Sequence, residues 1–256
     1  LATMSGMYAQ YHGPEGLKKI AMHIHRSAST ISTSLKKIGY LVPDCLFFDT
    51  IQVIPHEGIT QEDIRKIALA SEVNFYYPGN GRILISTDEV TSLEDINTIV
   101  GIFARAAGQT AEKVESLVEC KCLEDKFLRK SSFLSASAFN SYHSETEMMR
   151  YIKMLERKDF SLTHSMISLG SCTMKLNPAT AMFAMSWPEF GNIHPFVPED
   201  QAEGYYMLMD ELGAALKEIT GFAAVSFQPN SGAAGEYAGL LVIREYHMTR
   251  GEGHRN

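Results

Sequence analysis

A stripe of apolar residues near the amino terminus is the feature that most restricts how this chain can fold. Its members recur at steps of three and four: Leu17, Ile20, Ala21, Ile24, Ala28, Ile31, Leu35 and Ile38. This spacing places them on one face of an α-helix. Pro14, next to Gly13, predicts where the helix begins, and Gly39 predicts where it ends. So long an apolar face has to be buried, and the first part of the chain therefore requires a packed domain.

Two histidines, His23 and His25, flank the stripe. Residues two apart on a helix point to different sides, so the pair is unsuited to share a metal ion. We expect both side chains to be solvated.

The residues that follow the first helix predict a small α+β domain that closes near residue 120. Thr60 with Asp63, and Ser92 with Asp95, have the spacing of helix-capping boxes. The other signals are runs of β-branched and aromatic residues, and a Pro-Gly-Asn-Gly turn. The expected elements are a strand at 45–54, a helix after Thr60, a hairpin of Val73–Tyr77 and Arg82–Ser86 around Pro78–Gly81, a helix from Ser92, and a helical continuation over Thr110–Val118.

Residues 121–142 are rich in serine and lack periodicity, which predicts a linker between the domain at 1–120 and a second region at 143–256. Residues 160–198 also show little periodicity. A segment of that length without regular structure is usually functional. The elements expected in the second region are a helix from Ser144 to about Arg157, a helix over Gln201–Ile219, a buried strand at Ala223–Gln228, a turn at Pro229–Ala233 and a helix from Ala234 to about Arg250.

Composition excludes several classes of protein. The net charge of −7 and the absence of a basic run disfavour a nucleic-acid partner. No apolar run reaches the roughly 18 residues of a membrane-spanning helix, so no membrane span is expected. The cysteines are too few and irregular for a disulfide scaffold or a metal site, so we expect four reduced thiols and no metal: Cys45, Cys120, Cys122 and Cys172. The opening at Leu1 and the ending without a terminal element suggest a piece of a longer protein.

The turn at Asn230–Glu236 is the first candidate site. It lies between a predicted strand and a predicted helix, where the backbone N–H groups of a helix start attract an anion. Gly232 and Ala233 would let a ligand approach the backbone, and Ser231 adds a hydroxyl. The spacing does not match a nucleotide-binding loop. From the residues alone, a phosphate site and a plain close-packed turn are equally favoured.

Two further clusters could face a substrate. Ser168–Asn177 contains Cys172, Lys175 and several hydroxyls, although such a loop can also satisfy its own backbone. Cys172 would need a base to act as a nucleophile, and only His164 and His194 lie near it in the sequence. Lys175 could form a Schiff base, but a solvated lysine is more frequent. Within Trp187–Pro198, His194 is either a satisfied core histidine or the wall of a ligand pocket.

Taken together, several long strings make the chain resemble the P-protein family of the glycine cleavage system. They occur in the family's order over nearly the whole chain, which makes the resemblance specific. The strings are Tyr8-x-x-Tyr11-His12-Gly13-Pro14-Glu15-Gly16-Leu17, Leu46–Thr50, Phe139–Glu147, Ser168–Asn177, Glu189–Gln201 and Gln228–Leu240.

The resemblance implies an incomplete fold-type-I, aminotransferase-like pyridoxal-phosphate enzyme of mixed α/β and α+β class. Residues 1–120 would be the small C-terminal domain of the first half, and residues 143–256 the beginning of the second, pyridoxal-phosphate-binding half. The implied activity is that of an oxidoreductase of the glycine cleavage system. It decarboxylates glycine with pyridoxal 5'-phosphate and transfers the aminomethyl group to the lipoyl arm of H-protein. A homodimer or paired halves are also implied, and the compartment would be the mitochondrial matrix in a eukaryote or the cytoplasm in a bacterium.

For the site, the resemblance assigns Ser231, Gly232 and Ala233 to the cofactor phosphate. The family's Schiff-base lysine is expected beyond Asn256, so no catalytic residue is predicted here, and the piece alone is expected to be inactive. Ser168 and Ala234 depart from the family pattern, which commonly has proline and glutamine there. The rival hypotheses are a different pyridoxal-phosphate enzyme and a non-catalytic interaction protein.

Overall fold

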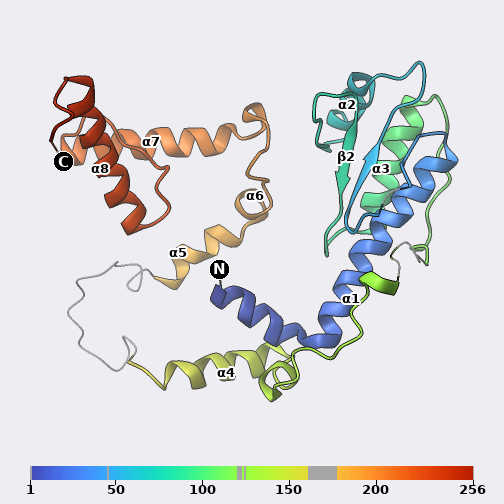
Figure 1. Cartoon of the computed structure of the whole chain (residues 1–256), viewed down its shortest axis with the longest axis horizontal. Helices are drawn as coiled ribbons and strands as arrows, with labels where there is room; N and C mark the ends of the chain where they lie inside the picture. The colour runs from blue at the N-terminus through green and yellow to red at the C-terminus, as the bar shows by residue number, and fades with distance from the viewer. Residues whose placement is uncertain (1, 45, 120–122, 124, 161–177, 256) are drawn as a thin grey trace. The chain divides into compact units, whose positions relative to one another are not determined.

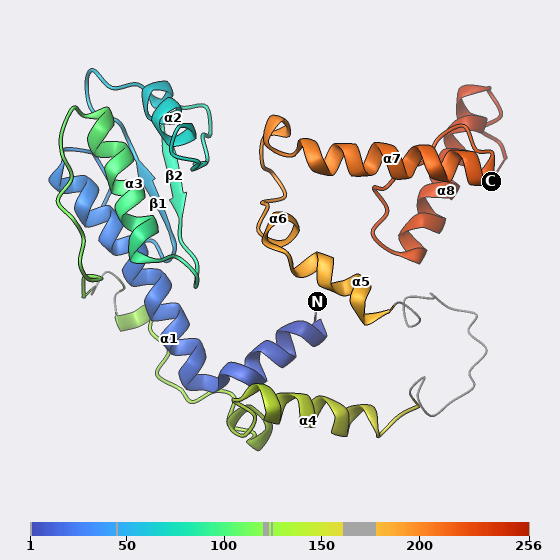
Figure 2. The same ribbon diagram turned by 180° about the vertical axis from the view of Figure 1, so that it is seen from behind.

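The structure, a computed structural model, describes residues 2–44, 46–119, 123, 125–160 and 178–255. Contacts divide the chain into two units, Leu1–Phe160 and Ser161–Asn256, which are described separately. The architecture mixes helices with a small two-stranded sheet in the described residues (Figures 1 and 2). The predicted domain limits at 1–120, 121–142 and 143–256 stay a prediction.

The first helix, α1, covers Ala2–Lys37 and is broken at Gly13, where φ is 62° and ψ is −179°. The predicted start at Gly13-Pro14 is therefore a break within α1, because the residues before it are helical as well. Pro14 has no N–H to continue the helical hydrogen bonds across this point. The predicted end is confirmed: Gly39 follows the last turn with φ 96°.

The sheet consists of β1 (Thr50–Val53) and β2 (Ile83–Ser86), which run antiparallel with Thr50 opposite Ser86. The strand predicted at 45–54 is thus shorter. The hairpin partner predicted at Val73–Tyr77 is wrong, because only Tyr76 forms a bridge, to Leu84. The N–H of Val73 donates instead to the carbonyl of Ala68 at the end of the preceding helix, 2.9 Å away, so it is not available to pair with β2.

Two capped helices complete the packing of the first unit. Both predicted capping boxes are present, at Thr60 with Asp63 and at Ser92 with Asp95, and they begin α2 (Gln61–Leu69) and α3 (Leu93–Ala106). Helix α3 packs on α1 and α2, and α1 also contacts β1. Side chains from these elements form one hydrophobic core: Ala28, Ile31, Leu35, Tyr40, Val42, Ile51, Val53, Ile64, Ala68, Ile83, Ile85, Ile96, Ile99, Val100, Ile102 and Phe103.

The segment Thr110–Val118 is not helical, contrary to the sequence prediction. Side chains from α1 and α3 take up its backbone groups instead. Asn97 accepts from the N–H of Val114 (2.8 Å) and donates to the carbonyl of Val114 (2.9 Å). The N–H of Val118 donates to the hydroxyl of Thr30 (3.0 Å). Because these contacts satisfy the backbone, the segment lies extended over the domain despite its helical periodicity.

The prediction of two solvated histidines is also wrong. His25 is buried, and its Nδ1 lies 2.9 Å from the carbonyl oxygen of Phe48, while its ring stacks on the Phe48 ring. His23 is partly buried, with Nε2 2.9 Å from the carbonyl oxygen of Thr91. Loops that follow the helix in sequence fold back over both side chains, which the helical pattern alone could not indicate.

The remainder of the first unit returns along α1. It contains the short 3-10 helices η1 (Asp125–Phe127) and η2 (Ser137–Asn140), followed by α4 (Glu145–Glu156). The hydroxyl of Ser144 accepts from the N–H of Glu147 and caps α4, as predicted. Helix η2 and the start of α4 lie beside the bend of α1 in both views (Figures 1 and 2).

The second unit is helical in its described part. Its elements are α5 (Ala179–Phe183), η4 (Ala184–Ser186), α6 (Pro188–Gly191), η5 (Glu199–Gln201), α7 (Glu203–Thr220) and α8 (Gly232–Thr249). Gly221 ends α7 in the left-handed conformation, with φ 74°, as predicted. No helix in the described part of the chain is long and apolar enough to cross a membrane.

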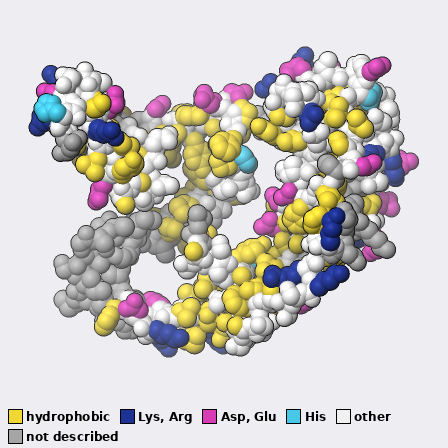
Figure 3. Space-filling view, in the orientation of Figure 1, with side chains coloured by type: hydrophobic (Ala, Val, Ile, Leu, Met, Phe, Trp, Pro, Cys, Tyr) yellow, Lys and Arg dark blue, Asp and Glu magenta, His cyan; other side chains and the backbone are white. Residues whose placement is uncertain are grey.

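The strand predicted at Ala223–Gln228 is wrong. These residues are exposed and irregular, and the described part of this unit contains no strand with which they could pair. The apolar faces predicted on the neighbouring helices are exposed too, as the yellow side chains over α7 and α8 show (Figure 3). Leu208 and Leu212 of α7, and Leu240 and Ile243 of α8, are members of these faces.

Candidate functional site: the start of helix α8

The predicted phosphate turn lies at the amino end of α8. Ser231 is the N-cap, with extended backbone (φ −160°, ψ 168°), and its hydroxyl oxygen accepts from the N–H of Ala234 at 3.3 Å. The carbonyl oxygen of Ser231 accepts the first helical hydrogen bond, from the N–H of Gly235 at 3.0 Å. Gly232 and Ala233 therefore occupy the first turn, where an α-helix leaves N–H groups without intrahelical acceptors.

Two side chains of the segment before this turn lie close to the neighbouring helices. The ring of Phe227 lies against Gly213 of α7, where an added Cβ would be 3.6 Å from the ring. Pro229 lies against Gly235, with 4.0 Å between the proline Cβ and an added glycine Cβ. The segment before Ser231, although exposed, therefore has one side chain near α7 and one near α8.

The electrostatics of this helix start favour an anion. The first turn of α8 contains no acidic residue, so no carboxylate there already neutralises the positive end of the helix dipole. Ser231, Gly232 and Ala233 are exposed, and a Cβ added at Gly232 would have no heavy atom within 4 Å. A phosphate could therefore reach the backbone N–H groups. The residues present fit such a group, with backbone donors and one hydroxyl.

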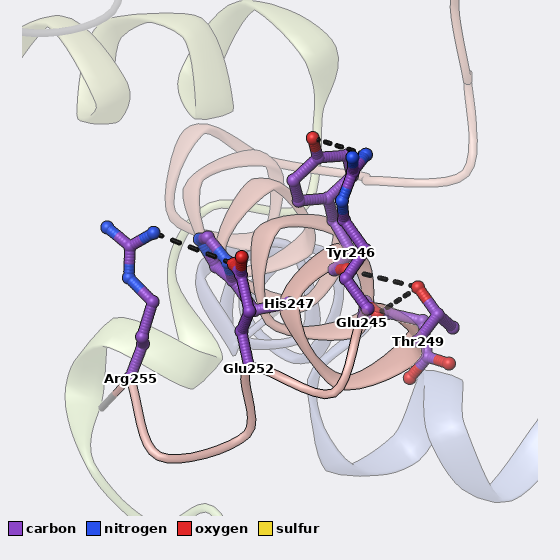
Figure 4. A network of polar contacts seen from close by, with 7 residues as sticks. Glu245, Tyr246, His247, Thr249, Glu252 and Arg255 are labelled. Atoms are coloured by element: carbon purple, nitrogen blue, oxygen red, sulfur yellow. Dashed lines mark hydrogen bonds and ion pairs between the residues drawn. The ribbon is translucent and has the colours of Figure 1, made fainter.

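The opposite end of α8 is closed by a polar network (Figure 4). The Nδ1 of His247 lies 2.7 Å from a carboxylate oxygen of Glu252, which Arg255 approaches at 3.6 Å. The hydroxyl of Thr249 donates to the carbonyl oxygens of Glu245 and Tyr246, both at 3.0 Å. Local contacts therefore support both ends of the helix.

Several predicted functional residues lie outside the described residues. They include all of Ser168–Asn177, with Cys172 and Lys175, and also His164. The other cysteines, Cys45, Cys120 and Cys122, are outside them as well. The predictions about thiols and about this loop therefore stay predictions. Among the residues that are described, no group of three or more His, Cys, Asp or Glu side chains could hold a metal ion.

The third cluster is exposed. His194 is not a core histidine, and its Nδ1 accepts from the N–H of Phe196 at 3.0 Å, which closes a local turn. The side chain of Trp187 is also exposed and approaches the ring of Phe190. The hydroxyl of Tyr205 donates to the carbonyl of Phe190 at 2.6 Å and ties this loop to α7.

Comparison with known proteins places these features in a family context. Residues 1–103 match the family described as glycine cleavage system P-protein. Over all 256 residues the chain is 51% identical to glycine dehydrogenase (decarboxylating) of Christiangramia forsetii and 53% identical to that of Bacteroides thetaiotaomicron, covering 27% of each. All of the chain also aligns, over 259 positions and at 49% identity, with 25% of the mitochondrial enzyme of that name from Solanum tuberosum.

These matches confirm the resemblance that the sequence strings predicted: residues 1–103 match the P-protein family, and along its whole length the chain is homologous to proteins named glycine dehydrogenase (decarboxylating). The relatives are named glycine dehydrogenase (decarboxylating), and the chain spans about a quarter of their length, 25 to 27% in these three.

Proposed function

We propose that this chain is part of a glycine dehydrogenase (decarboxylating) and contributes the phosphate-binding turn of its pyridoxal-phosphate site. The observation that carries the proposal is the N-terminal turn of α8. Ser231 caps a helix whose first turn is exposed, free of acidic side chains and open at Gly232. Identity of about half of all positions to enzymes of this name supports it.

The geometry of the turn supports the proposed roles of its residues. The N–H groups of Gly232 and Ala233 would donate to phosphate oxygens, and the hydroxyl of Ser231 would add a further hydrogen bond. Bound pyridoxal 5'-phosphate supplies an electron sink for loss of carbon dioxide from glycine. The turn itself holds the cofactor by its phosphate and orients it. Ala234, where the family often has glutamine, would contribute its backbone and no polar side chain.

The fold and the partners belong to the same proposal. We assign the chain to the fold-type-I class, with residues 1–120 as the small domain of the first half and 143–256 as the beginning of the second. The complete enzyme would act on glycine, pass the aminomethyl group to lipoylated H-protein, and work as a homodimer or as paired halves. It would be mitochondrial in a eukaryote and cytoplasmic in a bacterium.

The substitution Gly232→Asp in the complete enzyme tests the assignment. An aspartate in the first turn suits the helix dipole, so α8 should be no less stable, but its charge would repel a phosphate. We expect the Kd for pyridoxal phosphate, measured by absorbance titration, to rise at least about tenfold, which corresponds to about 1.4 kcal/mol.

Gly239→Asp is the matched control. Gly239 lies in the same helix beyond the first turn, and a Cβ added there meets nothing within 4 Å. The same change of side chain at this position should leave the Kd close to that of the parent enzyme. Equal affinity of the two variants and the parent would refute the phosphate assignment.

Lys175 provides a second test, on the 256-residue chain itself. We propose that the lysine which bonds to the cofactor is not among these residues. Incubation with pyridoxal phosphate followed by borohydride reduction and peptide mass spectrometry should then give no specific lysine adduct. A stoichiometric adduct at Lys175 that disappears in Lys175→Arg would contradict this part of the proposal.

A further inference from the structure

The break in α1 divides this helix into two arms. Residues 2–12 form the N-terminal arm, and residues 14–37 form the C-terminal arm. At the break, Gly13 has a positive φ and Pro14 has no N–H, so the ladder of helical hydrogen bonds is interrupted. The backbone of α1 alone therefore does not fix the angle between the arms. Contacts outside α1 have to determine this angle.

Residues 132–151, called the strap here, lie across this break. On the N-terminal side, the Nδ1 of His143 lies 2.8 Å from the carbonyl oxygen of Tyr11. A carbonyl only accepts, so this nitrogen carries the proton and donates. The side-chain amide of Gln10 donates to the hydroxyl of Tyr151 at 2.9 Å. The strap thus holds the last turn of the N-terminal arm at two points.

The strap also contacts the C-terminal arm. The ammonium group of Lys18 lies 5.7 Å from the centre of the Phe133 ring, and η2 packs on α1. A hollow of about 450 Å³ remains between them, lined by Pro14, Glu15 and Lys18 on one side and by strap residues on the other. The strap therefore contacts both arms but is not tightly packed against the C-terminal arm.

Gly13 is the point where strap and break meet. A Cβ at this position would lie 2.7 Å from Cε1 of His143 and 2.8 Å from the carbonyl oxygen of Phe139. The second of these atoms is backbone, which cannot move without moving the strap. Only glycine permits both the positive φ and this close approach. The break and the seating of the strap therefore depend on the same residue.

The arm and the strap contribute little to the main core. The core cluster is built from residues of the C-terminal arm, β1, β2, α2, α3 and adjoining loops. By contrast, the buried residues of the arm and strap are Gln10, Gly13 and Met148. Because no strap residue belongs to the core cluster, this region can open locally while the core remains folded.

From these contacts we propose that the strap sets the angle between the two arms of α1. Release of the strap would free residues 2–12 to move about Gly13. The device lies within the first unit and does not depend on cofactor binding. Glu89, in the loop after β2, is the natural comparison, because burial raises the pKa of Tyr8 in the arm and the carboxylate of Glu89 is near enough to raise it further. This half-exposed tyrosine does not involve the strap.

The test measures the distance between the two arms in the 256-residue chain. Keto-reactive spin labels placed on an unnatural amino acid at Met4 and Lys37, both exposed, avoid the native cysteines. Pulsed electron–electron double resonance should give one narrow distribution of distances between the two labels in the parent. The double variant Gln10→Ala with His143→Ala should give a broad one, with amide exchange in residues 139–151 faster by about tenfold or more. The core should melt as in the parent.

Matched variants distinguish the loss of the strap contacts from a general loss of folded structure. Gly13→Ala should broaden the distribution as the double variant does, whereas Gly6→Ala, where an added Cβ meets nothing within 4 Å, should not. Glu89→Ala should have a small effect. The proposal is overturned if the distribution stays narrow while exchange shows the strap detached, or if the strap stays protected in both Gly13→Ala and the double variant.

Discussion

The hydroxyl of Tyr40 donates to the carbonyl oxygen of Phe103 at 2.8 Å, and the two rings meet edge to face at 5.0 Å. Tyr40 follows α1 and Phe103 lies in α3, so one side chain joins the two helices that cover the sheet through both a hydrogen bond and ring packing. Both residues are buried. The contact therefore ties the end of the first helix to the last helix of the core.

The first prediction concerns alkaline pH. Burial raises the pKa of Tyr40 from 10.0 to about 12, because the charged phenolate would lose its solvation. A raised pKa in the folded state stabilises the fold fully below the unfolded value near 10, and this contribution is lost as pH rises toward 12. We expect the free energy of unfolding to fall between pH 10 and 12. Urea unfolding across this range measures it.

Tyr40→Phe keeps the ring packing but removes the hydroxyl. It should cost about 1 kcal/mol at neutral pH, because the Phe103 carbonyl loses its donor, and it should flatten the decline above pH 10. Burial also raises the pKa of Tyr77 to about 12, so the double variant with Tyr77→Phe should be flatter still. A decline as steep in the double variant as in the parent would show that other groups cause it.

The second prediction concerns the capping box of α2. Hydrogen bonds from the Thr60 hydroxyl and backbone N–H lower the pKa of Asp63. A lowered pKa gives a contribution that is present above the unfolded value near pH 4 and is lost as pH falls through the folded value. Thr60→Ala should cost about 1 kcal/mol at pH 7 and should weaken the loss of stability in acid. Thr60→Ser should behave as the parent, and equal acid sensitivity of all three proteins would contradict the assignment.

The third prediction concerns Asn97, which holds the extended segment after α3. Its side chain makes two hydrogen bonds to the backbone of Val114. Asn97→Ala should cost about 1–3 kcal/mol, because it leaves a partly buried N–H and carbonyl without partners. Amide exchange in residues 110–118 should rise more than in the core helices. Asn97→Asp is the sharper control, because its side chain can still accept from the N–H of Val114 but cannot donate to the carbonyl. Its free energy of unfolding should lie between those of the parent and of Asn97→Ala.

The features that could be predicted are those that depend on residues close together in the sequence. Thr60 with Asp63, Ser92 with Asp95, and the Ser144 cap each satisfy backbone groups within three residues of themselves. Such local hydrogen bonds need no knowledge of the rest of the chain. The start of α8 was predicted less well: the helix was expected from Ala234, whereas it begins at Gly232 with Ser231 as its N-cap.

What could not be predicted depends on residues far apart in sequence. Thr30 bonds to Val118 across 88 positions, and the burial of His25 depends on Phe48, 23 positions away. His143 and Tyr11 are separated by 132 positions. Two separate family strings, 8–17 and 139–147, contain this last pair, and that was the signal available in the sequence. Their contact became visible only in the structure.

The last prediction separates two roles of Ser231, as helix cap and as phosphate ligand. As N-cap it accepts from the N–H of Ala234, a contact that aspartate can reproduce and alanine cannot. Amide exchange at the start of α8 should therefore rank Ser231→Asp with the parent, and Ser231→Ala as less protected, by about 1 kcal/mol.

Pyridoxal-phosphate affinity in the complete enzyme should follow a different order. Ser231→Ala loses one hydrogen bond to the phosphate and should bind about threefold to tenfold more weakly. Ser231→Asp places a negative charge against the phosphate and should bind most weakly of the three, although its helix is as well capped as the parent's. Titration of each apoenzyme with the cofactor supplies the affinities. If affinity instead followed helix protection, with the aspartate variant binding as the parent does, Ser231 would act on the cofactor only by capping α8 and would not contact its phosphate.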